Sequence, residues 1–205
     1  MLQEATKKQK VAKPALSIYR FKVTLIDIKP AIWRRFEVHH AHSFQELHHI
    51  LQTVMGWKTI HAYQFTIGNL MLTDEESAEM LRQHGSKNVF DAAKILINEL
   101  LTKRGQTFTY QYDFGDGWDH KITLEEIKRV DRLPNFPRCL DGKRACPLEN
   151  SGGTLAYCEL LEILQDPTDI EYEELREWVG ENFDPDAFSV ATINLELEQS
   201  ILDWE

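Results

Sequence analysis

The sequence is poor in cysteine, with three among its 205 residues. An odd and sparse set of cysteines is unlike the even framework that holds small secreted domains together. No apolar run approaches the roughly 20 residues needed to cross a bilayer, and the first residues lack the apolar middle of a secretory signal. We therefore expect reduced thiols in a cytoplasmic protein that does not enter the membrane.

The chain also lacks the short motifs of common catalytic families. It contains no Gly-x-Ser-x-Gly elbow. The Asp-Phe-Gly triplet at 113–115 occurs without the glycine-rich loop and the His-Arg-Asp motif that a protein kinase needs. The sequence thus carries no local signature of nucleophilic hydrolysis or phosphoryl transfer.

Basic residues are scarce in the C-terminal part. Residues 141–205 contain 3 Lys/Arg and 17 Asp/Glu, a balance of -14, whereas residues 1–140 contain 20 and 16. Such an acidic surface repels phosphate backbones, so we expect no binding to duplex DNA. The one basic cluster, in residues 1–16, has no periodicity and is expected to be a disordered tail.

Hydrophobic residues make up 42% of the chain, enough for a core. Alternating apolar residues predict strands at 18–26, 32–38, 63–67, 70–72, 108–114 and 118–124. Helical spacing predicts helices at 43–55, 90–103, 154–164 and 172–179, a loop or short helix at 74–79, and favours a helix over a strand at 186–201. We expect an α+β domain over 17–205, with a sub-boundary near 130–138. Its antiparallel or mixed sheet would be built from hairpins, with helices packed on it and a helical C-terminal third.

The helix at 43–55 has the clearest boundaries. Ser43-Phe-Gln-Glu46 is a capping box, and Gly56 is a stop signal. His48 falls on the apolar stripe of this helix, so we predict a hydrogen-bonded core histidine there.

The stretch YDFGDGWDH at 112–120 predicts a hairpin tip. A loop of three residues, 115–117, would pair Phe114 with Trp118 and Tyr112 with His120, which keeps both apolar rows on one face. The same register would place Asp113 directly opposite Asp119, where like charges repel. It would also require a left-handed residue in the loop, expected at Gly117.

Carboxylates at this tip allow two interpretations. Asp113, Asp116 and Asp119 could hold a hard divalent ion, or they could accept hydrogen bonds from turn amides at a solvated tip. We favour the second because a metal-binding loop needs more spaced ligands than these.

The segment 139–153, CLDGKRACPLENSGG, contains two cysteines seven residues apart. This spacing is not the tight pair of a zinc knuckle, and His120 or a carboxylate would have to complete a zinc site. We favour a turn-rich loop and expect no cofactor. The weak metal candidates are Asp113, Asp116, Asp119, His120, Cys139 and Cys146.

Five ordered motifs, PAIWRRFEV, ELHHILQTVMGW followed by HAYQF, YDFGDGWDH, CLDGKRACPLENSGG and FDPDAF, resemble the plasmid pRiA4b ORF-three-like family over residues 17–200. Its members are also labelled TnpR passenger proteins of insertion elements. The positions that match the family pattern are Trp33, Arg34, His48, Trp57, His61, Tyr112, Asp113, Phe114, Gly115, Asp116, Trp118, His120, Gly142, Pro147, Glu149, Gly152, Gly153, Asp184 and Pro185.

The resemblance implies an α+β fold and an association with mobile elements, and it supplies no established activity. Members often read Pro-Pro-Glu-Asp-Cys-Gly-Gly where this chain has Leu148, Asn150 and Ser151, so a zinc or catalytic role of that loop is weaker here. The recombinase label is not supported by the residues. A serine resolvase needs a basic DNA-binding tail, whereas the C-terminal part of this chain, residues 141–205, is acidic.

Polar residues concentrated on two glycine-rich loops predict a binding or accessory module, because loops commonly carry function. The alternative is a metal-dependent hydrolase in which the same carboxylates hold an ion that activates water. Either reading uses one polar surface and a protein or small-molecule partner. The candidate residues of this surface are Asp113, Asp116, Trp118, Asp119, His120, Asp141 and Glu149.

Overall fold

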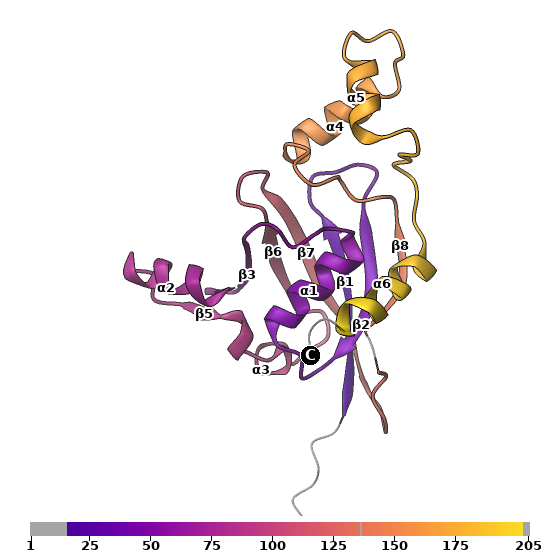
Figure 1. The fold of residues 1–205 in the computed structure, drawn as a ribbon. Coiled ribbons are helices and arrows are strands. Elements are labelled where there is room, and N and C mark those ends of the chain that lie inside the picture. Colours follow the sequence, from indigo (N-terminus) through magenta and orange to yellow (C-terminus); the bar gives the residue numbers. More distant parts are fainter. Residues whose placement is uncertain (1–15, 136, 203–205) are drawn as a thin grey trace, which may run out of the picture.

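A computed structural model describes residues 16–135 and 137–202, and the side chains up to residue 200 (Figure 1). One eight-stranded sheet lies at the centre, in the order β5-β4-β3-β6-β7-β1-β2-β8. Neighbouring strands are antiparallel except β4 and β5, which are parallel. The strands are β1 (Ser17–Leu25), β2 (Trp33–His39), β3 (Tyr63–Ile67), β4 (Leu70–Thr73), β5 (Val89–Asp91), β6 (Thr107–Tyr112), β7 (Trp118–Arg129) and β8 (Arg138–Lys143). The predicted α+β class with a mixed sheet is confirmed.

The helices are α1 (Phe44–Met55), α2 (Glu75–Gln83), the short 3-10 helix η1 (Ala92–Lys94), α3 (Ile97–Leu100), α4 (Gly153–Ile163), α5 (Tyr172–Val179) and α6 (Val190–Leu202). Figure 1 shows α1 and α6 on the same face of the sheet, whereas α4 and α5 stand beyond one end of it. The C-terminal part is helical, as predicted. None of the helices formed by residues 16–135 and 137–202 has the length and apolar character to cross a membrane. The basic segment 1–16 lies, except for its last residue, outside the described part.

Helix α1 begins and ends where the sequence predicts. Ser43 and Glu46 form the reciprocal capping box, and Gly56 ends the helix in the left-handed conformation at φ 86°. Phe44, Leu47 and Leu51 on this helix are fully buried against the sheet. The amphipathic stripe therefore forms the middle of the core.

Arg34 lies on the buried face of β2 and joins several elements. It is 3% exposed. Its guanidinium donates to the carbonyl oxygens of Val54 in α1 (2.9 Å) and Lys143 (3.0 Å), and it contacts Cys146 Sγ at 3.1 Å. It also lies 4.7 Å from the ring centroid of Phe188. One side chain thus holds α1, the end of β8 and the segment before α6 together.

The opposite face of the sheet is polar. Arg20 pairs with Glu37 at 2.7 Å, and Arg35 pairs with Glu125 at 2.6 Å and with Asp141 at 3.5 Å. These side chains alternate along the strands with the buried ones. The period-2 pattern of the sequence therefore separates a core face from a charged face.

The helix predicted at 90–103 is wrong. The segment forms β5, then η1, then an extended stretch at Ile95 (φ -112°), and only then the short α3. The backbone N–H of Phe44 donates to the Ile95 carbonyl at 3.0 Å, and the N–H of Ile97 donates to the His42 carbonyl at 2.8 Å. These hydrogen bonds to residues at the start of α1 take the place of the backbone bonds of the helix that the apolar spacing predicted.

The predicted hairpin register is also wrong. Tyr112 pairs with Trp118 and Tyr110 with His120, so the loop is the five-residue segment 113–117. The apolar residues of β6 and β7 do share one face of the sheet, as predicted. Their pairing, however, is shifted by two residues along β6 relative to the predicted register. Phe114, at 52% exposed, is left outside the core.

The wider loop is explained by the side chain of Asp113. Its Oδ1 accepts hydrogen bonds from the N–H groups of Gly115 (2.9 Å) and Asp116 (3.3 Å), which closes an Asx-type turn. Asp113 therefore does not face Asp119, which pairs with Gln111, and the predicted repulsion is absent. Gly117 does adopt the expected positive φ, 70°.

His48 is a core histidine, as predicted, and it makes stability dependent on pH. It is 2% exposed and lies 2.8 Å from the Tyr110 hydroxyl, which accepts a hydrogen bond from Gln52 Nε2. The hydroxyl proton is then available to Nδ1 of a neutral imidazole. Burial lowers the pKa of His48 to about 3.

We expect the free energy of unfolding to fall by about 2 kcal/mol between pH 7 and pH 5 through His48 alone. The unfolded chain, with a histidine pKa of about 6.5, binds more protons than the folded chain in this range. The contribution is complete above that value and is lost as the pH falls towards 3. Urea unfolding of wild type at both pH values measures the total loss, to which the buried His120 also contributes, and the part of the loss that disappears in a His48→Gln variant is the contribution of His48. Equal stability at both pH values, or an imidazole NMR signal of His48 that titrates near pH 6.5, would refute the assignment.

Candidate functional site

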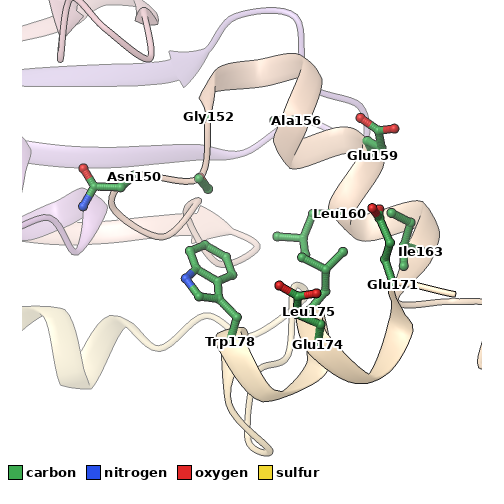
Figure 2. A pocket seen from close by; sticks show the side chains of 11 residues that line it. Asn150, Gly152, Ala156, Glu159, Leu160, Ile163, Glu171, Glu174, Leu175 and Trp178 are labelled. Atoms are coloured by element: carbon green, nitrogen blue, oxygen red, sulfur yellow. The ribbon is translucent and has the colours of Figure 1, made fainter.

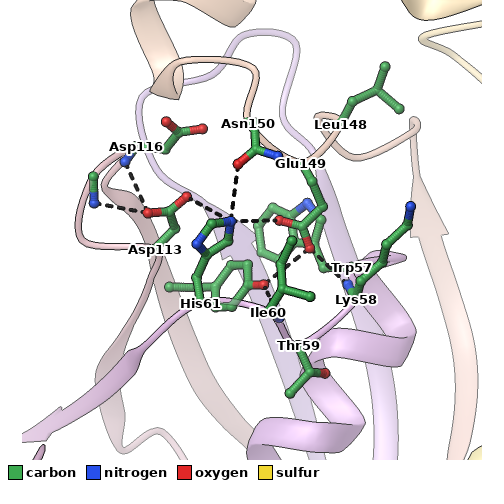
Figure 3. A network of polar contacts seen from close by, with 12 residues as sticks. Trp57, Lys58, Thr59, Ile60, His61, Asp113, Asp116, Leu148, Glu149 and Asn150 are labelled. Atoms are coloured by element: carbon green, nitrogen blue, oxygen red, sulfur yellow. Dashed lines mark hydrogen bonds and ion pairs between the residues drawn. The ribbon is translucent and has the colours of Figure 1, made fainter.

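Three loops meet at one end of the sheet (Figure 3). They are residues 57–62 between α1 and β3, the hairpin loop 113–117 between β6 and β7, and residues 147–152 before α4. Antiparallel pairing of β3 with β6 and of β6 with β7 places the first two side by side. The third reaches them because β8 lies at the sheet edge and its chain then crosses towards α4 (Figure 1).

At this junction four polar side chains, the His61 cluster, converge: His61, Asp113, Glu149 and Asn150 (Figure 3). His61 Nε2 lies 3.2 Å from Asn150 Oδ1, 3.4 Å from Asp113 Oδ2 and 3.7 Å from Glu149 Oε2. The side chain of His61 is 27% exposed, whereas those of Asp113 and Glu149 are 10% and 11% exposed. Three acceptor oxygens thus face one ring nitrogen at the surface.

Each carboxylate of the cluster has one oxygen fixed by the protein. Asp113 Oδ1 accepts from the turn amides of its own loop. Glu149 Oε1 accepts from the backbone N–H of Lys58 at 2.8 Å and from the Tyr112 hydroxyl at 3.1 Å. The other oxygen of each carboxylate is directed at His61. The cluster is therefore positioned before any ligand arrives.

Aromatic side chains support the cluster from below. The Trp57 indole N–H donates to the Pro147 carbonyl at 2.8 Å, and its ring stacks on Tyr112 at 5.0 Å between centroids. Burial, with Glu149 close by, raises the pKa of Tyr112 to about 12, so its hydroxyl stays a donor at neutral pH. Thr59, with φ 58°, donates its N–H to Gln52 Oε1 at 2.9 Å. The loop that carries His61 is thus bound to α1 and to β6.

The hairpin tip and the third loop also touch directly. Asp116 Oδ2 accepts from the N–H of Gly152 at 3.0 Å. Gly153, at φ 81°, lies so close to Asp116 that an added Cβ would collide with the Asp116 carbonyl oxygen. The hairpin tip therefore contacts the end of the segment 139–153, whereas the first residues of that segment, predicted to be part of a turn-rich loop, form strand β8.

The other candidate residues lie elsewhere. Trp118 and His120 are 0% exposed and belong to the core below the cluster, so neither side chain reaches a ligand at the surface. Burial lowers the pKa of His120 to about 4, and its Nδ1 donates to the Tyr110 carbonyl at 3.1 Å. Asp119 is exposed on the polar face of the sheet, where Asp141 pairs with Arg35.

His61 and Asn150 are the cluster residues that sequence reasoning did not select. The partners of His61 are Asp113, Glu149 and Asn150, which lie 52, 88 and 89 positions further along the chain. The available signal was the position of His61 in HAYQF, two residues before the predicted strand at 63–67 and within a family motif. His61 comes to lie beside the carboxylates only because β3 and β6 pair in the sheet.

The six weak metal candidates do not come together. Cys139 is buried in β8, and Cys146 lies 3.7 Å from Met55 Sδ, beside Arg34. Burial raises the pKa of the Cys146 thiol to about 11, which disfavours the thiolate that a zinc ion binds. Within the described part of the chain, no group of three or more His, Cys, Asp and Glu is arranged to hold a metal ion.

Comparison with known proteins agrees with this fold. The chain is 31% identical to the uncharacterized protein y4hQ of Sinorhizobium fredii over 192 residues, 92% of this chain and 94% of that protein. The crystal structure of a protein of unknown function, MM3350 from Methanosarcina mazei, superposes with a TM-score of 0.77 at 31% identity, covering 87% of this chain and 98% of the other. The family model of plasmid pRiA4b ORF-3-like proteins matches residues 17–192. The chain therefore belongs to the plasmid pRiA4b ORF-3-like family.

Proposed function

We propose that the protein is a cytoplasmic binding module whose His61 cluster recognises a donor-rich cationic group, an ammonium or a guanidinium, on its ligand. The observation that carries the proposal is the imbalance in the cluster. One imidazole nitrogen can donate one hydrogen bond, yet three acceptor oxygens face it at 3.2–3.7 Å. At least two acceptors are left for an arriving donor.

The charge of the cluster supports a cation. Neither Asp113 nor Glu149 has a Lys or Arg partner among the described residues, and His61 is their one ion-pair partner there. Buried carboxylates without a compensating charge are costly, so a bound cation with several N–H donors would relieve that cost. A guanidinium, with its planar fork of donors, matches two converging carboxylate oxygens well.

Other features fit an intracellular binding module. All three cysteines are free thiols, as expected in a reducing compartment. The acidic balance of residues 141–205 favours a cationic ligand and disfavours duplex DNA.

Arginine amide, acetylated on its α-amino group so that the guanidinium is its one charge, should raise the unfolding temperature of the wild-type protein, because a ligand that binds only the folded state stabilises it. Citrulline amide, acetylated in the same way and therefore uncharged, should have no effect. Glu149→Gln should abolish the shift, because it removes a charge from the cluster and keeps the size of the side chain. Differential scanning fluorimetry measures all three.

Asp119→Asn is the matched control, since it removes a carboxylate from the same hairpin on the other face of the sheet and should leave the shift intact. Equal shifts from both amides, or none from either, would reject the cationic ligand. The metal-dependent hydrolase makes a different prediction. A stoichiometric divalent ion in untagged protein, lost with EDTA and dependent on Glu149, would replace our proposal with that alternative.

A further inference from the structure

Helices α4 and α5 and the loop 150–152 line an open pocket of about 420 Å³ (Figure 2). We call it the α4–α5 pocket. Leu160, Leu175 and Trp178 form its apolar wall, and Figure 2 shows the Trp178 indole directed towards the loop at Asn150. The volume falls in the range of roughly 300–1,000 Å³ that ligand pockets occupy.

The apolar wall of this pocket is partly open to solvent. Trp178, which lines the pocket together with Leu160 and Leu175, is 48% exposed. A half-exposed tryptophan in an apolar pocket is typical of an interaction site. Tryptophan is also among the residues that most often dominate the binding energy of interfaces.

The charged residues of the pocket all have the same sign. Glu159, Glu171 and Glu174 line it, and neither Lys nor Arg does. None of the three forms an ion pair with a residue of the described part of the chain. The pocket is therefore an open apolar pocket with an uncompensated acidic rim.

The helix dipole accounts for the negative charge at only some of the glutamates in this rim. Glu174 lies in the first turn of α5, where the helix dipole favours a negative charge, and Glu171 is the N-cap residue of that helix. Glu159 lies in the interior of α4, beyond the first turn, so the dipole gives no reason for its charge. Its position over an apolar wall needs another explanation.

We propose that the α4–α5 pocket binds a basic segment of a partner protein, which inserts a large apolar side chain between Leu160, Leu175 and Trp178 and places flanking Lys or Arg side chains on the three glutamates. Charge complementarity selects the partner, because this acidic rim repels nucleic acid and anionic membrane surfaces. The pocket shares Asn150 with the His61 cluster, but the proposed contacts use neither Asn150 nor the other three residues of that cluster.

Selection from a random peptide library displayed on phage, with the full-length protein as bait, tests the inference. The enriched peptides should carry Lys or Arg next to Leu, Phe or Trp. A fluorescein-labelled copy of the best peptide should then bind at low salt and weaken as salt is added, because the rim charges are exposed. Trp178→Ala should raise its dissociation constant at least tenfold, as loss of a central interface tryptophan does.

Two control variants make the test specific. Leu155→Ala removes an exposed apolar residue of α4 that does not line the pocket, and it should leave the affinity unchanged. Glu159→Gln should weaken binding about threefold, whereas Glu162→Gln, one turn further along α4 and outside the pocket, should not. The inference fails if no peptide is enriched, if the enriched peptides lack basic residues, or if Trp178→Ala binds like wild type. Binding that is lost in Glu149→Gln but kept in Trp178→Ala would belong to the His61 cluster instead.

Discussion

Replacing Arg34 by leucine should lower the free energy of unfolding by about 4 kcal/mol. Leucine leaves the buried carbonyl oxygens of Val54 and Lys143 without the donors that Arg34 supplies. An unsatisfied buried acceptor costs on the order of 1–3 kcal/mol. The contact of the guanidinium with the Phe188 ring is lost as well. Urea unfolding followed by far-UV circular dichroism measures the change.

Arg35→Leu is the matched control, because Arg35 is the next residue of the same strand and points to the other face. Its side chain is 30% exposed and pairs with Glu125, which is 27% exposed. Half-exposed ion pairs contribute little, so we expect a loss below about 1 kcal/mol. Similar losses in both variants would mean that Arg34 acts as an ordinary strand residue and does not join α1 to the end of β8.

Much of the fold follows from local patterns. Strands β1 to β4 and β7 were predictable because one face of the sheet is buried and the other is polar, which produces alternation along each strand. Helix α1 was predictable down to its ends, because Ser43, Glu46 and Gly56 satisfy backbone groups within a few residues of the chain. Patterns of this kind need no knowledge of distant segments.

The predictions are wrong where backbone groups hydrogen-bond to distant residues or to side chains and not to their neighbours in the chain. The segment 90–103 has apolar residues at helical spacing, yet Ile95 and Ile97 hydrogen-bond to the entry of α1. At the hairpin, pairing rules alone favoured a loop of three residues. The side chain of Asp113 stabilises a loop of five residues. The pattern of apolar residues contains no information about this hydrogen bonding.

The candidate site was predictable in part for the same reason. Asp113, Asp116 and Glu149 stood out because they lie in glycine-rich motifs. The cluster is completed by His61 and Asn150, which meet only after β3 has paired with β6 and the loop before α4 has crossed the end of the sheet. No spacing in the sequence contains that information. The two buried residues, Trp118 and His120, share the motif because they anchor it in the core.

The contact between the hairpin tip and the third loop gives the other large expected effect. Gly153→Ala should lower the free energy of unfolding by about 3 kcal/mol. About 1 kcal/mol comes from placing a side chain at a positive φ, here 81°. The rest arises because the new Cβ collides with the Asp116 carbonyl oxygen, so the tip must move away from the loop. That movement also breaks the hydrogen bond from Gly152 to Asp116.

Gly117→Ala separates the two contributions. Gly117 has a similar φ of 70°, but a Cβ there would meet nothing within 4 Å, so its alanine variant should lose only about 1 kcal/mol. The difference between the variants in urea unfolding measures the packing of the tip against the loop. Because Asp113 and Asp116 share that tip, Gly153→Ala should also weaken the arginine amide response, whereas Gly117→Ala should keep it. Equal losses of stability in the two variants would show that the third loop yields to the new methyl group at little cost, and that the two motifs are not held together as one surface.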